Sequence, residues 1–403
     1  MEKTVLIIST LDTKGAETLY LADKIRALGL QPLLMDLSMK GEGHPEAQIK
    51  PTEILSRSGE DIEQIRASKE RSLITNAMIK GACKMAQELY ADQRIQGALG
   101  IGGSTGSLMA TEVMRSLPFG IPKIMLSSTA ALPGLSTRYI GTGDIALFHS
   151  VIEISGLSNL LKNVLDRAAL AVQAMISGDV TVPKADRGKA IAITMLGPCE
   201  QCASRVRKAL EDEGYQVIGF SAAGIGDRAM EDMIAQGYFH GVIDLAPGGV
   251  GEHIFGFMRD AGPRRLENAG DQGIPQIIST CSVNHMTPAK SRYKPDFHQR
   301  PKYDLDKYRT WIRLNTEELR TVARAFADKL NKTKGPVKIV IPLKGWSSVD
   351  SPGSPTYAPD EDRVFLEELR SCLRSDIDIV EVDANMEDPP VANKIIELAK
   401  GLF

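Results

Sequence analysis

The sequence predicts an α/β protein with two Rossmann-like domains, each built on a parallel sheet, and a cleft between the domains. Three observations carry this prediction. The chain has 403 residues, which is more than a single hydrophobic core usually supports. Short apolar runs rich in β-branched residues alternate with segments of helical spacing, the pattern of βαβ units. A charged segment at 178–187 separates two such series, so the expected domains are residues 1–180 and 181–403.

The first domain opens on residues 4–9, a fully apolar run that predicts a central parallel strand. Further strands are expected at 31–37, 97–101 and 124–126, and helices at 16–28, 68–90, 107–117 and 149–177. The last of these helices carries an apolar stripe from Val151 to Met175, which favours core packing or a dimer interface. A homodimer is therefore expected.

The second domain repeats the alternation and predicts another parallel layer. Its strands are expected at 190–195, 216–220, 241–245, 275–279, 337–341 and 377–382. Its first turn contains Cys199 and Cys202 at the start of a helix. This spacing suits redox or soft-metal chemistry, and the alternative is two small residues at a helix start.

Composition excludes several classes of protein. Lys and Arg number 48 and Asp and Glu number 51, so the net charge of −3 provides no basic field for nucleic acid. Five cysteines in a chain of this length do not form a disulfide scaffold, which favours a reducing, cytoplasmic compartment. The chain enters a strand directly after Met-Glu-Lys, so we expect no signal peptide. No apolar run reaches the roughly 18 residues of a membrane span.

Residues 95–111 join a predicted strand to a helix through the pattern Gly100-x-Gly102-Gly103-Ser104-x-Gly106. The first turn of a helix leaves backbone N–H groups unpaired, and the positive end of the helix dipole attracts anions. Glycines let a phosphate approach these groups closely. No Gly-Lys-Ser/Thr closes the turn, so it is not a Walker loop. The sequence predicts a phosphate-bearing small molecule at 102–107, and the alternative is a tight turn without a ligand.

Polar side chains follow two other strands of this domain, at 10–14 and 127–129. The carboxyl ends of parallel strands share one edge of a sheet, so these side chains are expected to lie near the glycine turn. Lys14 could neutralise phosphate, and Asp12 or Asp144 could hold a hydrated Mg²⁺ ion. The alternatives are a helix cap for Asp12, a surface residue for Lys14 and a turn residue for Asp144.

Chemically versatile side chains also follow the strands of the second domain. The candidates for general acid–base catalysis are His253, His285 and Lys344. The alternative metal sites are His253 with Glu252, and His285 with Asp296 and His298. The candidate contacts for an anionic substrate are Arg264, Arg265 and Arg300. Each of these residues could equally be an ordinary loop or surface residue.

Five segments of the first half are STLDTKG (9–15), GIGGSTGS (100–107), RSLPFGIPKIMLSST (115–129), YIGTGD (139–144) and FHSVIEISGLSNL (148–160). In these segments the chain resembles a two-domain family of bacterial members with unassigned chemistry. That family also includes the ATP-binding amino-terminal region of the tomato mosaic virus resistance protein. The resemblance continues in the second half, at 220–245, 261–277, 313–319 and 342–357. Thr105 departs from it, because the family usually has glycine there.

The resemblance implies ATP and Mg²⁺ in the first domain. The residues that match the family's nucleotide loops are Asp12, Thr13, Lys14, Gly102, Gly103, Ser104, Gly106, Ser127, Ser128, Gly141, Thr142 and Asp144. Thr105 and Ser107 lie in the same glycine turn and complete the expected cofactor-binding set.

Three functions fit these features. The first is an ATP-dependent enzyme that acts on a small anionic metabolite in the interdomain cleft. The second is a non-catalytic module that binds another protein and is stabilised by ATP. The third is a metal-dependent lyase or hydrolase centred on the second domain, with the first domain supporting a dimer.

Overall fold

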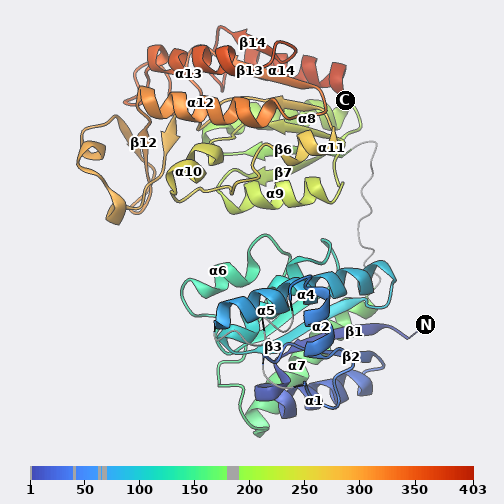
Figure 1. Cartoon of the computed structure of the whole chain (residues 1–403). Coiled ribbons are helices and arrows are strands. Elements are labelled where there is room, and N and C mark those ends of the chain that lie inside the picture. Colours follow the sequence, from blue (N-terminus) through green and yellow to red (C-terminus); the bar gives the residue numbers. More distant parts are fainter. Residues whose placement is uncertain (1, 40–41, 62–64, 66–69, 179–189) are drawn as a thin grey trace. The chain divides into compact units, whose positions relative to one another are not determined.

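The computed structural model describes residues 2–39, 42–61, 65, 70–178 and 190–403. The chain divides into two compact units, Met1–Pro183 and Lys184–Phe403, called unit 1 and unit 2 below. The segment expected to link two domains, 178–187, lies outside the described residues except at its first position. Each unit is an α/β layer structure with a parallel sheet at its centre (Figure 1).

Unit 1 contains a five-stranded parallel sheet in the order β2-β1-β3-β4-β5. Its strands are β1 (Thr4–Ser9), β2 (Gln31–Asp36), β3 (Gly97–Gly102), β4 (Lys123–Ser127) and β5 (Ala146–His149). Its helices are α1 (Leu11–Ala27), α2 (Pro51–Arg57), α4 (Arg71–Ala91), α5 (Ser104–Arg115), α6 (Leu135–Ile140) and α7 (Asn159–Ser177). The strand order reverses between β1 and β3, so the connections that leave these two strands diverge.

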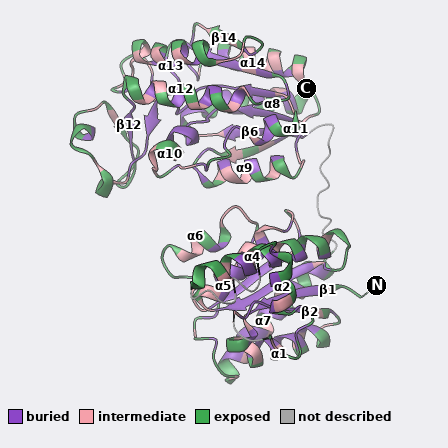
Figure 2. Cartoon of the chain, viewed as in Figure 1, coloured by how far each residue is buried: buried purple, intermediate pink, exposed green. Residues whose placement is uncertain are grey.

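The core of unit 1 lies on both faces of the sheet, which explains why its central strands are apolar throughout. In β1, Val5 and Ile7 pack with α1 and α7, whereas Leu6 and Ile8 pack with α2, α4 and α5. All four side chains are fully buried. Figure 2 shows the buried strands between helices whose outer faces are exposed.

The helix expected at 149–177 is wrong at its start. Residues 146–149 pair with β4 as the edge strand β5, and α7 begins only at Asn159. Positive φ angles at Val151 (66°) and Gly156 (75°) prevent a continuous helix between the two elements. The Ser158 side chain then accepts a hydrogen bond from the Leu161 N–H and caps α7.

Unit 2 contains a six-stranded parallel sheet in the order β14-β13-β9-β8-β6-β7. Its strands are β6 (Ala190–Met195), β7 (Gln216–Ser221), β8 (Gly241–Asp244), β9 (Gln276–Ile278), β13 (Val337–Pro342) and β14 (Asp378–Val382). A small antiparallel sheet, which the sequence did not predict, consists of β10 (His285–Met286), β11 (Lys302–Asp304) and β12 (Thr310–Arg313).

Two helices cover one face of this sheet and four cover the other. The helices of the first face are α8 (Glu200–Asp212) and α14 (Pro389–Leu402). Those of the second face are α9 (Ile225–Ala235), α11 (Asn268–Gln272), α12 (Thr316–Leu330) and α13 (Pro359–Cys372). The short helix α10 (Gly249–Phe255) follows β8. The predicted fold class, two α/β layers with Rossmann-like parallel sheets, is confirmed. Within the described ranges, no helix is long and apolar enough to cross a membrane.

Candidate functional site

A pocket of about 710 Å³ lies at the carboxyl ends of β1 and β3 in unit 1. These two strands are neighbours in the sheet, and the strand order reverses between them. Open α/β sheets bind ligands at this kind of switch point. The residues that line the pocket are Thr10, Asp12, Thr13, Lys14, Met39, Arg71, Ile74, Gly103, Ser104, Thr105 and Gly106.

Two helices begin at this pocket, and the first of them, α1, already has acceptors for its leading N–H groups. The Leu11 N–H donates to Asp36 Oδ1 over 3.0 Å, and the Asp12 N–H donates to Ser38 Oγ over 2.9 Å. Thr13 and Lys14 both donate from their N–H groups to the Thr10 carbonyl. The positive end of α1 is therefore satisfied within the chain.

The second helix, α5, has no such acceptors. Its N-cap is Gly103, and no side chain of the described residues caps it. The helical bonding begins with the Ser107 N–H, which donates to the Gly103 carbonyl over 2.9 Å. The N–H groups of residues 104–106 therefore have no intrahelical partner, and their residues line the pocket. These free donors and the helix dipole make the start of α5 the end of the pocket that best suits an anion.

Ser107 and Ser127 belong to the structural support of this site. Both are fully buried, and their hydroxyls lie 2.7 Å apart. The Ser127 hydroxyl also accepts from the Thr129 N–H over 3.1 Å. This pairing fixes the start of α5 against the end of β4, so these two serines hold the glycine turn in place.

Two cationic side chains line the pocket, and one of them was missed from the sequence. Lys14 donates from Nζ to the Ile154 carbonyl over 2.5 Å. Arg71, at the start of α4, is exposed at the rim. Nothing in the sequence marks Arg71 as a pocket residue, because it lies far along the chain from the strand ends that form the pocket. The carboxylate of Asp12 is exposed and has no partner among the described residues, which suits a metal ligand.

Asp144 does not join Asp12, which corrects the expected grouping. Its carboxylate takes a hydrogen bond from Lys123 Nζ at 2.5 Å and another from the Gly120 N–H at 2.7 Å. Lys123 opens β4, and Asp144 precedes β5, so this pair lies at the amino ends of the strands. The pocket at the start of α5 lies at the carboxyl ends.

Gly141 and Thr142 belong to the same turn as Asp144 and are likewise kept away from the pocket. A Cβ on Gly141 would lie 2.9 Å from the Arg115 side chain, and Arg115 is the last residue of α5. The Arg115 guanidinium donates to the carbonyls of Arg138 and Tyr139. This turn therefore packs around the far end of α5.

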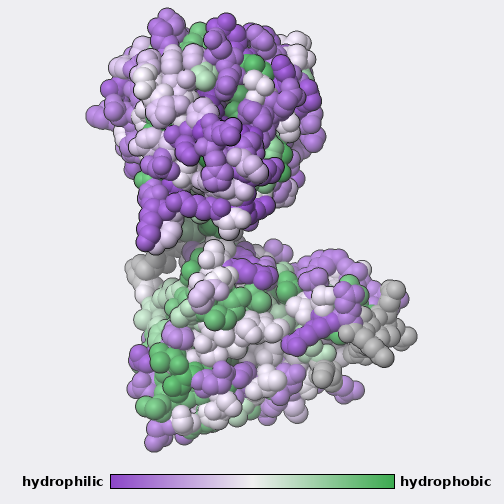
Figure 3. Space-filling view, turned by 90° about the vertical axis from the view of Figure 1, so that its left-hand side faces the viewer, coloured by the Kyte–Doolittle hydropathy of each residue, from purple (hydrophilic) through white to green (hydrophobic). Residues whose placement is uncertain are grey.

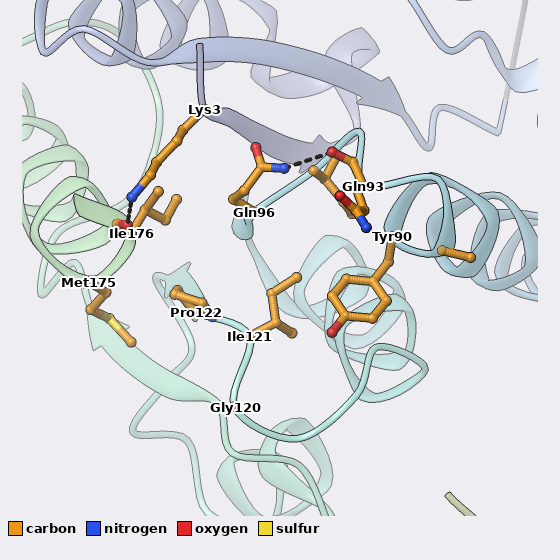
Figure 4. Close-up of a pocket in the computed structure, with 11 residues that line it drawn as sticks. Lys3, Tyr90, Gln93, Gln96, Gly120, Ile121, Pro122, Met175 and Ile176 are labelled. Atoms are coloured by element: carbon orange, nitrogen blue, oxygen red, sulfur yellow. Dashed lines mark hydrogen bonds between the residues drawn. The ribbon is translucent and has the colours of Figure 1, made fainter. Parts of the chain in front are cut away.

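A second pocket of about 610 Å³ lies at the amino ends of the strands in unit 1 (Figure 4). Its polar groups mostly bond to one another. Lys3 Nζ donates to the Ile176 carbonyl over 2.7 Å, and Gln96 Nε2 donates to the Gln93 carbonyl over 2.8 Å. The Tyr90 ring extends toward the apolar side chains of the pocket. This pocket offers no row of free N–H donors, so it is a poorer place for a phosphate.

In unit 2 the strand order reverses between β6 and β8. The place at the end of β8 where a ligand would bind is occupied by buried charged side chains of the protein itself. Arg265 is fully buried and donates to Asp244, the last residue of β8, over 2.8 Å. Asp227 and Glu231 lie 3.2 and 3.3 Å from the same guanidinium. Arg265 therefore has three carboxylate partners inside the protein, and it cannot serve as the expected contact for an anionic substrate.

A second buried cluster joins Arg313 to two aspartates. Arg313 Nη2 donates to Asp362 Oδ1 over 2.5 Å and Nη1 lies 3.5 Å from Asp350 Oδ1. Asn284 Nδ2 donates to both carboxylates, over 2.8 and 2.9 Å. Burial raises the pKa of Asp362 to about 7, and the neighbouring Asp350 charge acts in the same direction.

This cluster predicts a pH dependence of stability. The folded-state pKa of Asp362 lies above the unfolded value of about 3.9, so the folded protein retains a proton that the unfolded chain has lost. We expect the free energy of unfolding to fall by about 2–4 kcal/mol more in the wild type than in Asp362→Asn between pH 4 and pH 8. Urea denaturation at several pH values measures this difference. The exposed neighbour Asp360→Asn is the control. Parallel profiles for wild type and Asp362→Asn would contradict the prediction.

The three candidate acid–base residues occupy different environments. His285 is buried, its Nε2 has no partner in the described chain, and burial with the charge of Arg313 lowers its pKa well below the usual value. Lys344 is half exposed and pairs with Asp383. His253 lies 2.9 Å from Asp260 through Nδ1 and remains partly exposed. No hydrogen bond or ion pair between described residues joins any two of the three.

The expected metal and redox sites of unit 2 gain no support from the geometry. In the described part of the chain, no three His, Cys, Asp or Glu side chains are arranged to hold a metal ion. Glu252 is fully buried and bound by Arg259 at 2.8 Å, so it does not act with His253. Cys199 and Cys202 are buried free thiols in the core, and burial raises the pKa of Cys202. A buried thiol with a raised pKa is a poor nucleophile and metal ligand.

Comparison with known proteins assigns both units to one family. The profile for the N-terminal domain of "Uncharacterised protein family (UPF0261)" matches residues 3–181, and the profile for its C-terminal domain matches residues 188–403. The chain belongs to the UPF0261 family. The suspected resemblance is thereby confirmed.

Relatives of this UPF0261 protein occur in bacteria and in tomato. A UPF0261 protein of Clostridium tetani is 33% identical over 100% of this chain and 99% of its own length. One from Brucella suis is 30% identical over 97% of this chain and 94% of its own. The ToMV resistance protein Tm-1(GCR237) of Solanum lycopersicum is 31% identical over 76% of this chain and 41% of its own length.

Solved structures are only distantly similar. UDP-N-acetylglucosamine 2-epimerase from Rickettsia bellii has 11% identity and a TM-score of 0.24, covering 69% of this chain and 78% of that chain. MurG from Acinetobacter baumannii has 12% identity and a TM-score of 0.24, with full coverage of both chains. Scores this low carry no conclusion about function.

Proposed function

We propose that this UPF0261 protein binds ATP with Mg²⁺ in unit 1, with the phosphates at the start of α5. The observation that carries the proposal is the uncapped first turn of α5, whose N–H donors open on the pocket between β1 and β3. Lys14 and Arg71 add positive charge there, and Met39 and Ile74 supply an apolar wall for the base. The resemblance to an ATP-binding region agrees with this choice of ligand.

Asp12 is the residue proposed to hold Mg²⁺ beside the phosphates. Mg²⁺ keeps several waters and takes one or two carboxylates plus phosphate oxygens, so a single free carboxylate at the pocket suffices. The bound ion would neutralise phosphate charge. Within the chain, Lys14 and the first turn of α5 would orient the phosphates.

The proposed function is that of an enzyme acting on a small anionic metabolite, with ATP as its cofactor. His253 is the best placed of the three acid–base candidates in unit 2. Its Nδ1 contacts Asp260, which fixes the tautomer and leaves Nε2 for a substrate, and the side chain is partly exposed. His285 lacks that access and Lys344 is held by Asp383.

The alternative proposal is a protein-binding module that ATP stabilises. Tomato relatives are named as ToMV resistance and susceptible proteins, although the matches cover only 41% and 38% of their lengths. Exposed hydrophobic side chains on unit 1 favour this alternative, including Leu132, Val151, Leu160 and Leu170. Figure 3 shows hydrophobic residues gathered in patches on one face of this unit. The same residues support the proposal of a homodimer. ATP turnover on addition of a metabolite would favour the enzyme.

Calorimetry with ATP tests the binding proposal. We expect the wild type to bind ATP, and Mg²⁺ to strengthen binding about tenfold because it offsets phosphate charge. Asp12→Asn is expected to lose this gain and to bind metal-free ATP at least as tightly as the wild type, because it also removes a negative charge from the pocket. Asp23→Asn removes an exposed carboxylate from the same helix and is the matched control. Absence of ATP binding with and without Mg²⁺ would sink the proposal.

A further inference from the structure

One acidic side chain lies at the α5 end of the pocket and was not predicted from the sequence. Glu153, in the segment that follows β5, has its Oε1 atom 3.5 Å from Lys14 Nζ. The Ser128 hydroxyl donates to the same Oε1 over 3.3 Å. Ser128 Oγ lies 3.8 Å from the position that a Cβ would occupy on Gly103. A carboxylate therefore contacts the cation of the pocket and lies next to the start of α5.

The segment that carries Glu153 is anchored to α1 by the residues that follow Glu153. Lys14 Nζ donates to the Ile154 carbonyl over 2.5 Å, and the Gly156 N–H donates to Glu17 Oε1 over 2.6 Å. Val151 takes a φ of 66°, a strained conformation for a β-branched residue. The backbone is thus fixed, and the Glu153 side chain, although 65% exposed, is held there because its Oε1 also accepts a hydrogen bond from the Ile154 N–H over 3.0 Å.

These contacts show where the charge of Glu153 acts. A ligand phosphate that reached the N–H groups of α5 and the ammonium of Lys14 would meet the Glu153 carboxylate as a like charge. The same carboxylate already pairs with the ammonium of Lys14, a positive charge that the phosphate would also need. A divalent cation bound with the phosphates would reverse the effect, because it offers a positive charge to both groups.

We propose that the Glu153 carboxylate competes with a ligand phosphate for the positive charge at this site. It thereby weakens binding of metal-free ATP and makes the site selective for the Mg²⁺ complex. The inference rests on the proposed ATP site and adds a selectivity residue to it. Glu153 acts through Lys14 and the field at α5, so it is a positioning residue with no part in a chemical step.

The test is calorimetric titration of Glu153→Gln with ATP in EDTA and in excess Mg²⁺. Glutamine keeps an acceptor oxygen for Ser128 and removes the charge. We expect metal-free ATP to bind the variant about three- to tenfold more tightly than the wild type, and the gain to shrink with Mg²⁺. Inorganic tripolyphosphate should show the same gain, because the effect acts on phosphate. Glu112→Gln, which makes the same charge change beside Arg115 at the end of α5, should match the wild type.

The outcomes separate the two proposals. Wild type that binds ATP, with Glu153→Gln no tighter in EDTA, overturns the role of Glu153 and leaves the ATP site standing. A gain for ATP without a gain for tripolyphosphate also overturns it. Metal-free ATP that binds only to the variant supports the competitor role in its strongest form. Failure of both proteins to bind ATP or tripolyphosphate under either condition overturns both proposals.

Discussion

Gly103→Asp is expected to abolish ATP binding, with a loss of at least about 100-fold, while unit 1 stays folded. Gly103 is the N-cap of α5, and a Cβ added there meets nothing closer than Ser128 Oγ at 3.8 Å. Its φ of −84° suits any residue. Aspartate is a favoured N-cap, so its carboxylate would bond the free N–H groups of the first turn and occupy the phosphate position. Its charge would also repel phosphate. Calorimetry with ATP measures the loss.

Two controls make this result specific. Gly103→Ala adds the methyl group without the charge or the cap, and is expected to bind ATP within about threefold of the wild type. The thermal midpoint of Gly103→Asp should equal or slightly exceed that of the wild type, because aspartate is a better N-cap than glycine by roughly a few tenths of a kcal/mol. Unimpaired ATP binding in a folded Gly103→Asp protein would place the nucleotide elsewhere.

Arg265→Met is expected to cause the largest loss of stability of any variant considered, about 3–5 kcal/mol at pH 8. The substitution leaves Asp227, Glu231 and Asp244 buried without their cation. Burial already raises the pKa of Asp227 and of Glu231 in the wild type. Without Arg265 these carboxyls hold protons more strongly, so the penalty should grow as the pH rises from 5 to 8. Urea denaturation at both pH values gives the two free energies.

The neighbouring arginine is the matched control. Arg264 is exposed and pairs with Asp271 at the surface, so Arg264→Met should change the free energy of unfolding by less than about 1 kcal/mol. A loss for Arg265→Met as small as that of Arg264→Met would mean that the three acids are not buried around the guanidinium.

The central strands of both sheets were predictable because they are buried on both faces and therefore read as apolar runs. The strands that the sequence did not predict are all short. β5 is an edge strand of only four residues, and its side chains are half or fully exposed. The strands of the small antiparallel sheet are two to four residues long and are held by pairings with distant residues.

The missed strand also explains the error over Asp144. Without β5, the turn at 139–144 could be placed only by its position soon after β4, whose carboxyl end lies at the ligand-binding edge. Because the turn leads into β5, Asp144 lies at the other edge, where Lys123 binds it. The glycine turn was predictable because strand, turn and helix are contiguous in the sequence. Arg71 and Glu153 were not, because folding alone brings them to that turn.

A crystal structure of the chain grown with ATP and Mg²⁺ tests the central claim most directly. Phosphate oxygens are expected within about 3 Å of the N–H groups of residues 104–106, with Mg²⁺ on the Asp12 side. A nucleotide bound at the opposite edge of the sheet, between Tyr90 and Ile121, or an empty pocket at saturating ATP, would contradict it.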